Sequence, residues 1–251
     1  AANPLVRRPN GSIYAENTDV LGFSLMLQRF CERRLGTTAQ ALLSGKPALV
    51  LGSGGASAAV QAALEDAGAQ VSVISRSGED TYQTLTERHA DAVLVVNATP
   101  VGMYPNCPAT PVPEKDLAQL KSLAGVLDVI YNPTRTGIVL AAEHLGIPAE
   151  TGLSMLVAQA LRSSELFQGR QLDVSLVDRI EAQILSETGN VILIGMPGCG
   201  KTTTGKRLAR MLGRPFVDID DAIEASTGKT AAYIISTQGE HEFRRVESSV
   251  T

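Results

Sequence analysis

Two glycine-rich turns constrain the fold of this 251-residue chain more than any other feature. Each follows a short apolar run and precedes a stretch of helical periodicity: the first lies in "VLGSGGASAAV" and the second in "VILIGMPGCGKTTTG". Such a turn is typical of α/β folds, because its glycines let the backbone approach a phosphate that the amides of the following helix N-terminus then bind. The sequence therefore predicts two α/β units in series.

The region from Lys46 to Glu150 alternates strands and helices. The runs "PALVLG", "AQVSVIS", "DAVLVVNAT" and "GVLDVIYNP" are rich in Val, Ile and Leu, as the buried strands of a parallel sheet are. We predict an α/β fold with a doubly wound, parallel, Rossmann-like sheet, followed by a partial P-loop α/β unit that starts with a strand at "NVILIG". Upstream we expect a hairpin at Asn10-Gly11 and a helix with Asp19 as its N-cap, ending at Gly36.

The first turn resembles a dinucleotide-binding turn, with Ser57 in place of the third glycine of G-x-G-x-x-G. The next predicted strand ends in Ser-Arg-Ser instead of an acidic residue, and an arginine pairs well with a 2′-phosphate, so we favour NADP over NAD. An ordinary tight turn and a solvated arginine are the alternatives. The predicted cofactor-binding residues here are Gly52, Ser53, Gly54, Gly55, Ala56, Ser75, Arg76 and Ser77.

The second turn, Gly195–Thr202, matches G-x-x-x-x-G-K-[ST] in full. The motif predicts that the backbone amides of this turn surround the phosphates of ATP. It also predicts that Lys201 reaches the β- and γ-oxygens and that Thr202 ligates Mg²⁺. The predicted cofactor-binding residues are Gly198, Cys199, Gly200, Thr202 and Thr203.

Bulk composition excludes several classes of partner. The net charge of −4 predicts no general attraction to nucleic acid or to an anionic membrane. The three cysteines form no CxxC pair, and no apolar run approaches the ~20 residues that span a bilayer. We expect a cytoplasmic protein with small-molecule partners, and the sequence predicts no particular oligomeric state.

Up to about residue 170 the chain resembles shikimate dehydrogenase. The resemblance rests on "AANPLVR", "ENTDVLGF", "LGSGGAS", "NATPVGM", "DVIYNPTRT" and "GLSMLVAQA", in this order. It implies NADPH-dependent reduction of 3-dehydroshikimate to shikimate, with Asp19 as the carboxylate of a catalytic Lys–Asp pair. A helix cap is the alternative role of Asp19, and the two are compatible. The resemblance further implies that Asn97, Thr99 and Met103 line the cofactor side and that Asn3, Asn17, Tyr131 and Gln159 contact the substrate.

From Val191 the chain resembles shikimate kinase, in "IGMPGCGKTTTGKRLA", "GRPFVDIDDAIE", "TGK" and "GEHEFRRVE". This implies ATP-dependent phosphorylation of shikimate to shikimate 3-phosphate. Lys201 and Asp220 would be catalytic, and Asp218 would lie near the Mg²⁺ that Thr202 ligates. Arg244 would bind the shikimate carboxylate and Glu247 would hold that arginine. Taken alone, "DIDD" reads equally well as an acidic helix start.

Both families act on one intermediate, so we read the chain as part of a fused, bifunctional polypeptide. No lysine of the chain lies in the motif of the family's catalytic lysine, and we expect these 251 residues alone to be inactive on shikimate. The alternatives are an NAD-dependent quinate/shikimate dehydrogenase and a non-catalytic, ligand-sensing relative. The predicted domains are residues 1–45 (end of the substrate domain and a bridging helix), 46–150 (NADP-binding), 151–189 (C-terminal dehydrogenase helices and linker) and 190–251 (truncated kinase P-loop domain).

Overall fold

A computed structural model of the chain describes residues 3–196 and 198–250. The chain divides into two compact units, residues 1–188 and residues 189–251. Among the described residues, no helix combines the length and apolar character needed to cross a bilayer.

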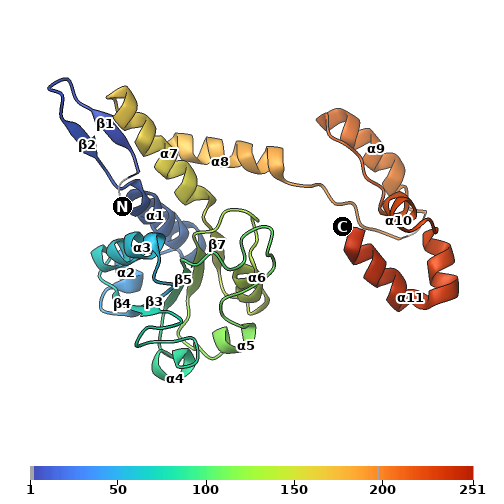
Figure 1. The fold of residues 1–251 in the computed structure, drawn as a ribbon, viewed down its shortest axis with the longest axis horizontal. Helices are drawn as coiled ribbons and strands as arrows, with labels where there is room; N and C mark the ends of the chain where they lie inside the picture. The colour runs from blue at the N-terminus through green and yellow to red at the C-terminus, as the bar shows by residue number, and fades with distance from the viewer. Residues whose placement is uncertain (1–2, 197, 251) are drawn as a thin grey trace. The chain divides into compact units, whose positions relative to one another are not determined.

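The first unit is built on a sheet of five parallel strands in the order β4-β3-β5-β6-β7 (Figure 1). The strands are β3 (Pro47–Leu51), β4 (Gln70–Ile74), β5 (Leu94–Asn97), β6 (Gly125–Asp128) and β7 (Ala149–Thr151). Successive connections run one way from β3 to β4 and the other way from β5 onward, so the order reverses between β3 and β5. Ligands of doubly wound sheets bind at this reversal point, outside the carboxyl ends of the strands. The predicted α/β class and doubly wound parallel sheet are confirmed.

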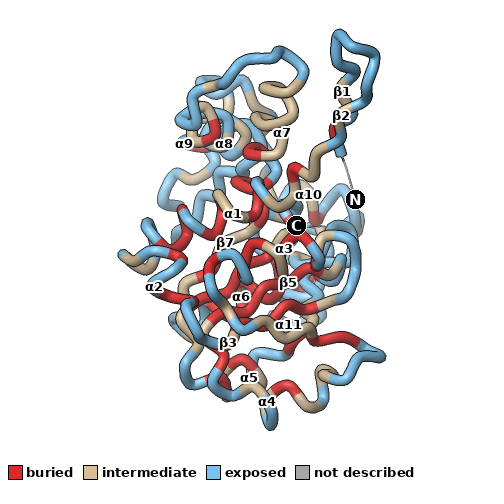
Figure 2. Tube along the Cα trace, turned by 90° about the vertical axis from the view of Figure 1, so that its left-hand side faces the viewer, coloured by how far each residue is buried: buried red, intermediate tan, exposed pale blue. Residues whose placement is uncertain are grey.

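Apolar side chains cover both faces of this sheet, because alternate strand residues point to opposite sides. Ala48 and Val50 pack into one buried cluster with α1 and α3, and Leu49 and Leu51 pack into a second cluster with α6. Buried segments accordingly run through the centre of the unit in Figure 2. The connecting helices are α3 (Gly55–Asp66), α4 (Leu85–Arg88), α5 (Glu114–Leu117) and α6 (Gly137–His144).

A hairpin and a long helix precede the sheet. Strands β1 (Leu5–Arg7) and β2 (Ile13–Ala15) pair antiparallel around the predicted turn, in which Gly11 has φ of 84°. Helix α1 (Thr18–Phe30) continues through a π-helical turn, η1 (Cys31–Leu35), and stops at Gly36, as predicted; a short α2 (Ala39–Leu43) follows. The predicted N-cap is wrong by two positions. Asn17 is the cap, and its side chain accepts a hydrogen bond from the Asp19 amide in the first turn.

Two helices close the first unit. Helix α7 (Leu153–Gln168) packs along α1, and α8 (Ser175–Thr188) packs on α7. Helix α8 lies in the stretch predicted to hold the C-terminal dehydrogenase helices and a linker. Its sequence is mostly polar, but Val177 is fully buried against α7 and Asp178 pairs with Arg29 of α1 at 3.2 Å. The helix is therefore an integral part of this unit.

The second unit consists of helices α9 (Lys201–Leu212), α10 (Ile219–Thr227) and α11 (Ala231–Val250). Its small core joins Ile223 of α10 to Ile234, Phe243 and Val246 of α11. The strand predicted at "NVILIG" is not formed. No other described segment of residues 189–251 pairs with this stretch, and Ile192 and Ile194 are 79% and 89% exposed. An extended segment without a hydrogen-bonded neighbour does not make a sheet.

Candidate functional site

The first glycine turn lies at the carboxyl end of β3, at the reversal point of the sheet. Gly52 has φ of 98°, and a Cβ there would lie 2.7 Å from the Cγ2 atom of Thr99, in the loop that follows β5. A side chain at position 52 is therefore excluded both by backbone conformation and by the close approach of this loop. The turn geometry depends on this glycine.

The next two glycines leave open space before helix α3. A Cβ on Gly54 or Gly55 would meet nothing within 4 Å, and Gly54 caps α3 with no side-chain hydrogen bond. The first amides of a helix have no partner within the helix, and open space beside these glycines would let a phosphate approach them. Binding of a dinucleotide at this turn stays a prediction.

The Ser-Arg-Ser segment follows the neighbouring strand β4. Leu51 of β3 pairs with Ile74 of β4, so Arg76 lies at the same edge of the sheet as the glycine turn. Its side chain is exposed, and it is close enough to Tyr82 for its positive charge to oppose the rise that burial causes in the pKa of that phenol. Ser75 is buried at the start of the turn, and Ser77 is exposed.

The residues predicted to line the cofactor side differ in exposure. Asn97 is fully buried: its Oδ1 accepts from the amide and hydroxyl of Thr99 at 3.0 and 2.7 Å, and its Nδ2 donates to Asp128 at 3.0 Å. Thr99 is half-buried, while Met103 is 46% exposed. In this arrangement Asn97 shapes the loop after β5, and direct contact with a cofactor stays a prediction.

Asp128 anchors that loop and was not nominated from the sequence. It is fully buried at the end of β6, where Oδ1 also accepts from the Ile130 amide at 3.0 Å and Oδ2 accepts from the Thr136 hydroxyl at 2.7 Å. Burial raises the pKa of Asp128, and these hydrogen bonds oppose the rise. Its position at the end of an apolar run, in "GVLD", was the available signal. These hydrogen bonds hold together the loops that follow β5 and β6, at the edge of the sheet formed by the carboxyl ends of the strands.

Residues predicted on the substrate side meet at the start of α1. The Nδ2 atom of Asn3 donates to Oδ1 of Asp19 at 2.7 Å, and the Asn17 side chain accepts from the Asp19 amide at 2.9 Å. One turn further along α1, a Cβ on Gly22 would lie 2.6 Å from the Cγ atom of Gln159, so the Gln159 side chain rests on the α1 backbone. The structure thus brings four of the five predicted substrate-side residues to one end of the α1–α7 pair.

Tyr131, the remaining predicted substrate contact, follows β6 and is 48% exposed. No described interaction joins it to the α1 group. Its place in a substrate pocket stays a prediction.

A charged cluster beside this group was also missed. Arg162 of α7 donates from Nε and Nη2 to the two carboxylate oxygens of Glu16 at 2.6 and 3.0 Å, and the Tyr14 hydroxyl donates to Oε2 of Glu16 at 2.6 Å. These bonds lower the pKa of Glu16, and the carboxylate raises the pKa of Tyr14. Arg162 lies three residues after Gln159, a spacing that the sequence pattern "QALR" contains without any motif to mark it.

The second glycine turn carries its predicted side chains at the start of α9. Gly198 and Gly200 have φ of 76° and 87°, a conformation that favours glycine. Lys201 Nζ donates to the carbonyl oxygens of Gly195 and Met196 at 2.7 and 2.9 Å. Cys199 and Thr203 are exposed, and Pro197 lies outside the described residues.

Two predicted magnesium-side oxygens are adjacent. The Thr202 hydroxyl donates to Oδ2 of Asp218 at 3.0 Å, and Asp218 caps α10 by accepting from the Asp220 amide at 3.2 Å. Hydroxyl and carboxylate oxygens suit Mg²⁺, which usually takes further ligands from water and phosphate. In the described ranges 3–196 and 198–250, no three His, Cys, Asp or Glu side chains gather as a metal site.

Of the remaining kinase-side residues, Asp220 and Arg244 are exposed and Glu247 is half-buried. Asp220 lies in the first turn of α10, and Arg244 of α11 donates to Glu247 at 2.8 Å and to Glu240 at 3.3 Å. The two carboxylates raise the pKa of Arg244. The guanidinium is held along its own helix with one face over the ring of Phe243, 5.3 Å from the centroid.

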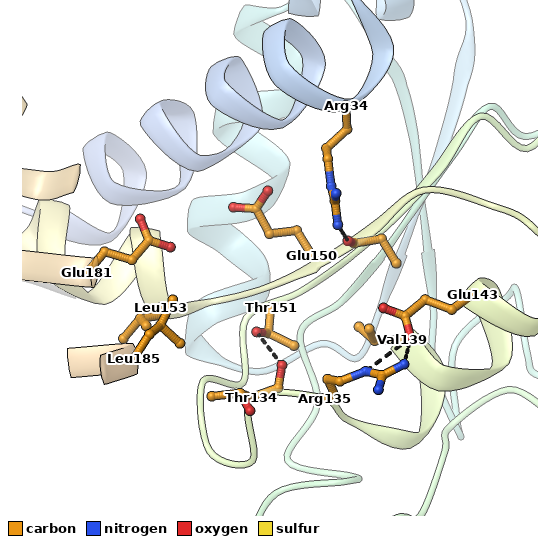
Figure 3. A pocket seen from close by; sticks show the side chains of 11 residues that line it. Arg34, Thr134, Arg135, Val139, Glu143, Glu150, Thr151, Leu153, Glu181 and Leu185 are labelled. Carbon is orange, nitrogen blue, oxygen red and sulfur yellow. Dashed lines mark hydrogen bonds and ion pairs between the residues drawn. The ribbon is translucent and has the colours of Figure 1, made fainter. Parts of the chain in front are cut away.

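A pocket of about 230 Å³ opens elsewhere in the first unit, beside β7 (Figure 3). Glu150 and Glu181 approach it from β7 and α8, and burial raises the pKa of both carboxyls. Arg34 and the Arg135–Glu143 ion pair complete its polar wall. No residue nominated from the sequence lines this pocket.

The chain is similar to known proteins over most of its length. The chain is 32% identical over 189 residues to a shikimate dehydrogenase (NADP(+)) of Clostridium perfringens, a match that covers 70% of this chain and 65% of the relative. It is 34% identical over 199 residues to the shikimate dehydrogenase (NADP(+)) of Sphingopyxis alaskensis, covering 74% of this chain and 67% of the relative. The chain belongs to the shikimate dehydrogenase family. It spans about two thirds of the length of these relatives.

Solved structures agree with this assignment. A chorismate mutase/shikimate 5-dehydrogenase fusion protein from Clostridium acetobutylicum matches 76% of this chain and 69% of its own, with TM-score 0.66 and 31% identity. The shikimate 5-dehydrogenase of Thermus thermophilus in complex with NADP(H) and shikimate matches with TM-score 0.57 and 29% identity, over 73% and 68%. A quinate dehydrogenase from Corynebacterium glutamicum in complex with NAD matches with TM-score 0.60 and 29% identity, over 74% and 68%.

The C-terminal part matches a different family. Residues 197–251 match the family model for shikimate kinase. This member of the shikimate dehydrogenase family therefore continues into a kinase-related segment, as the sequence motifs predict.

Proposed function

We propose that the polypeptide containing this chain reduces 3-dehydroshikimate to shikimate with NADPH and phosphorylates shikimate with ATP and Mg²⁺. The observation that carries the dehydrogenase proposal is the hydrogen bond between Asn3 and Asp19, two predicted substrate-side residues 16 positions apart. It is supported by relatives that are named shikimate dehydrogenase (NADP(+)).

The chemistry assigned to this chain concerns proton transfer and orientation. A bound nicotinamide would supply a hydride to the carbonyl carbon of the ketone. Asp19 assists proton transfer to the carbonyl oxygen, and the bond from Asn3 holds its carboxylate in place. Asn17 and Gln159 orient the ring hydroxyls from α1 and α7. Gly52, Gly54 and Gly55 shape the turn that binds the pyrophosphate.

The test is steady-state oxidation of shikimate by the natural polypeptide that contains this chain, followed by NADPH fluorescence. We expect Asp19→Asn to lower kcat by about 10²- to 10⁴-fold while NADP⁺ affinity stays unchanged. Asp66→Asn is the matched control, because Asp66 is exposed at the end of α3. Equal kcat for Asp19→Asn and wild type would reject the role of Asp19. Binding of shikimate and NADP⁺ without turnover in the wild type would indicate the ligand-sensing alternative.

The preference for NADP is part of this proposal. Arg76 lies exposed at the edge of the sheet next to the glycine turn, where a 2′-phosphate would lie. We expect wild type to bind NADP⁺ more tightly than NAD⁺ by calorimetry, and Arg76→Ala to remove most of the difference. The similarity to a quinate dehydrogenase in complex with NAD favours a second candidate, an NAD-dependent quinate/shikimate dehydrogenase. Specificity constants for quinate and shikimate with each cofactor separate the two.

For the kinase segment we propose that Lys201 binds the β- and γ-phosphates, that Thr202 and Asp218 hold Mg²⁺, and that Asp220 and Arg244 bind shikimate. The Thr202–Asp218 contact and the match of residues 197–251 to the shikimate kinase model support this. We expect Lys201→Met to abolish shikimate-dependent ADP production. Lys229→Met, which removes an exposed lysine elsewhere in this unit, should leave it intact. Equal loss in both variants would reject the assignment.

We propose the domain limits 1–45, 46–150, 151–189 and 190–251, a cytoplasmic location, and small-molecule partners without nucleic acid or membrane. The net charge of −4 supports the last point.

A further inference from the structure

Helix α7 is tied to the start of α1 by a charged contact next to the proposed substrate residues. Arg162 binds both oxygens of Glu16 with two of its donors, and Glu16 also accepts from Tyr14 of β2. The Glu16 side chain is only 14% exposed and that of Arg162 is 35% exposed. A bidentate, partly buried pair of this kind orients its partners more strongly than an exposed ion pair does.

Backbone contacts connect Glu16 directly to the proposed substrate residues. Asn3 donates its amide to the Glu16 carbonyl at 3.0 Å, and the Asn3 side chain then reaches Asp19 at 2.7 Å. Asn17 is the next residue and caps α1. A displacement of Glu16 would therefore move Asn3, Asn17 and Asp19 together.

On the other side, Arg162 belongs to the helix that carries Gln159. The two residues are three positions apart and so lie on neighbouring parts of one helix face. The third donor of Arg162 contacts Glu165 at 3.1 Å, and Glu165 accepts from the Leu172 amide at 2.9 Å, beyond the end of α7. Arg162 is thus fixed from its own helix as well.

We infer that Arg162 and Glu16 are positioning residues that hold the Asn3–Asn17–Asp19 group in register with Gln159, and so determine how tightly the substrate binds. This inference rests on the proposed function. Neither residue needs to touch the substrate. Because small displacements of binding groups are costly, loosening the contact weakens substrate binding and leaves the NADP turn, which lies on β3 and α3, unaffected.

The test compares Arg162→Gln, Arg162→Lys and Glu16→Gln in the natural polypeptide. We expect Arg162→Gln and Glu16→Gln to raise the KM for shikimate about tenfold, with the KM for NADP⁺ within about twofold of wild type. Arg162→Lys keeps the charge but not the bidentate geometry, so it should recover part of the loss. Arg135→Gln is the matched control, because it breaks the Arg135–Glu143 ion pair in the same unit, away from α1.

Hydrogen exchange gives a readout that does not depend on activity. We expect the amides of residues 16–20 to exchange about tenfold faster in Arg162→Gln and at the wild-type rate in Arg135→Gln. An unchanged KM for shikimate in an active Arg162→Gln enzyme, or an equal rise in both KM values, overturns the inference alone. If the wild type turns over no shikimate, the proposed function fails, and unchanged exchange would separately show that Arg162 does not hold the segment.

Discussion

The two glycine turns have similar sequences and very different surroundings. The turn at Gly52 is enclosed by neighbouring strands, and its glycine is required by the approach of Thr99. The turn at Gly198 and Gly200 follows an unpaired apolar segment, and a Cβ on either glycine would meet nothing within 4 Å. Both turns therefore place glycines at positive φ, but only the first is packed against neighbouring parts of a sheet.

The largest expected difference concerns the glycines themselves. Gly52→Ala combines an unfavourable φ with a clash against Thr99, so we expect the first unit to lose about 3 to 4 kcal/mol of stability. Gly198→Ala has only the backbone cost, about 1 kcal/mol in the second unit. Hydrogen exchange measured separately for each unit tests the comparison. Equal losses in both units would show that the surroundings of Gly52 are not rigid.

Buried and exposed carboxylates give the next difference. Asp128→Ala leaves the buried groups of Asn97, Ile130 and Thr136 without their acceptor, and we expect a loss of about 3 kcal/mol. Asp218→Ala removes a partly exposed helix cap, with an expected loss of about 1 kcal/mol. Hydrogen exchange of the amides of β5 and β6 measures the effect of Asp128→Ala, and exchange of the amides of α10 measures the effect of Asp218→Ala. A larger loss for Asp218→Ala contradicts the contrast between the units.

Ion pairs offer a third comparison. Asp178→Ala leaves Arg29, whose side chain is 8% exposed, without its carboxylate partner, and should cost about 2 kcal/mol and loosen α8. Glu242→Ala breaks the exposed Arg245–Glu242 pair of α11 and should cost at most about 0.5 kcal/mol. Limited proteolysis near Thr188 measures the loosening of α8, and thermal melts measure the loss of stability in both variants. Resistance of α8 to proteolysis in Asp178→Ala would show that the apolar contacts around Val177 are sufficient to hold it.

The smallest expected effect is on pH dependence. The pKa of Glu16 is below its ordinary value of 4.5 in the folded state, so its contribution is complete above that value and is lost as pH falls through the folded pKa. Glu16→Gln should therefore flatten the decline of Tm between about pH 7 and pH 3. Asp128 and Glu150 act in the opposite sense, since their raised pKa values favour the folded state when protonated. Glu242→Gln is the control: the pKa of Glu242 is also lowered, but solvent screens it.

Sequence reasoning predicted the sheet well and the second unit less well. Four apolar runs between glycine signals identified β3 to β6, because buried parallel strands carry their signal locally. The run at residues 191–194 has the same composition and no strand, because pairing depends on neighbours that periodicity does not describe. Helix α8 shows a related limit: buried Val177, partly buried Ile184 and the Asp178–Arg29 pair attach a helix whose other residues are mostly polar.

The site shows the same division. Asn3, Asn17, Asp19 and Gln159 come from motifs, and the structure gathers them at one end of two helices. Asp128 and Arg162 act through contacts with residues 31 and 146 positions away, which a single sequence does not reveal. Motifs thus identified residues of proposed chemistry, whereas the supporting role of Asp128 and Arg162 became visible only in three dimensions.

Gly22 has no functional group, yet it determines how near Gln159 comes to α1, since even one methyl group there would overlap the glutamine side chain. The spacing between α1 and α7 beside the proposed substrate residues therefore depends on the absence of a side chain at position 22. A change of preferred substrate could therefore begin at position 22, by separating two helices, before any residue that touches the substrate is exchanged.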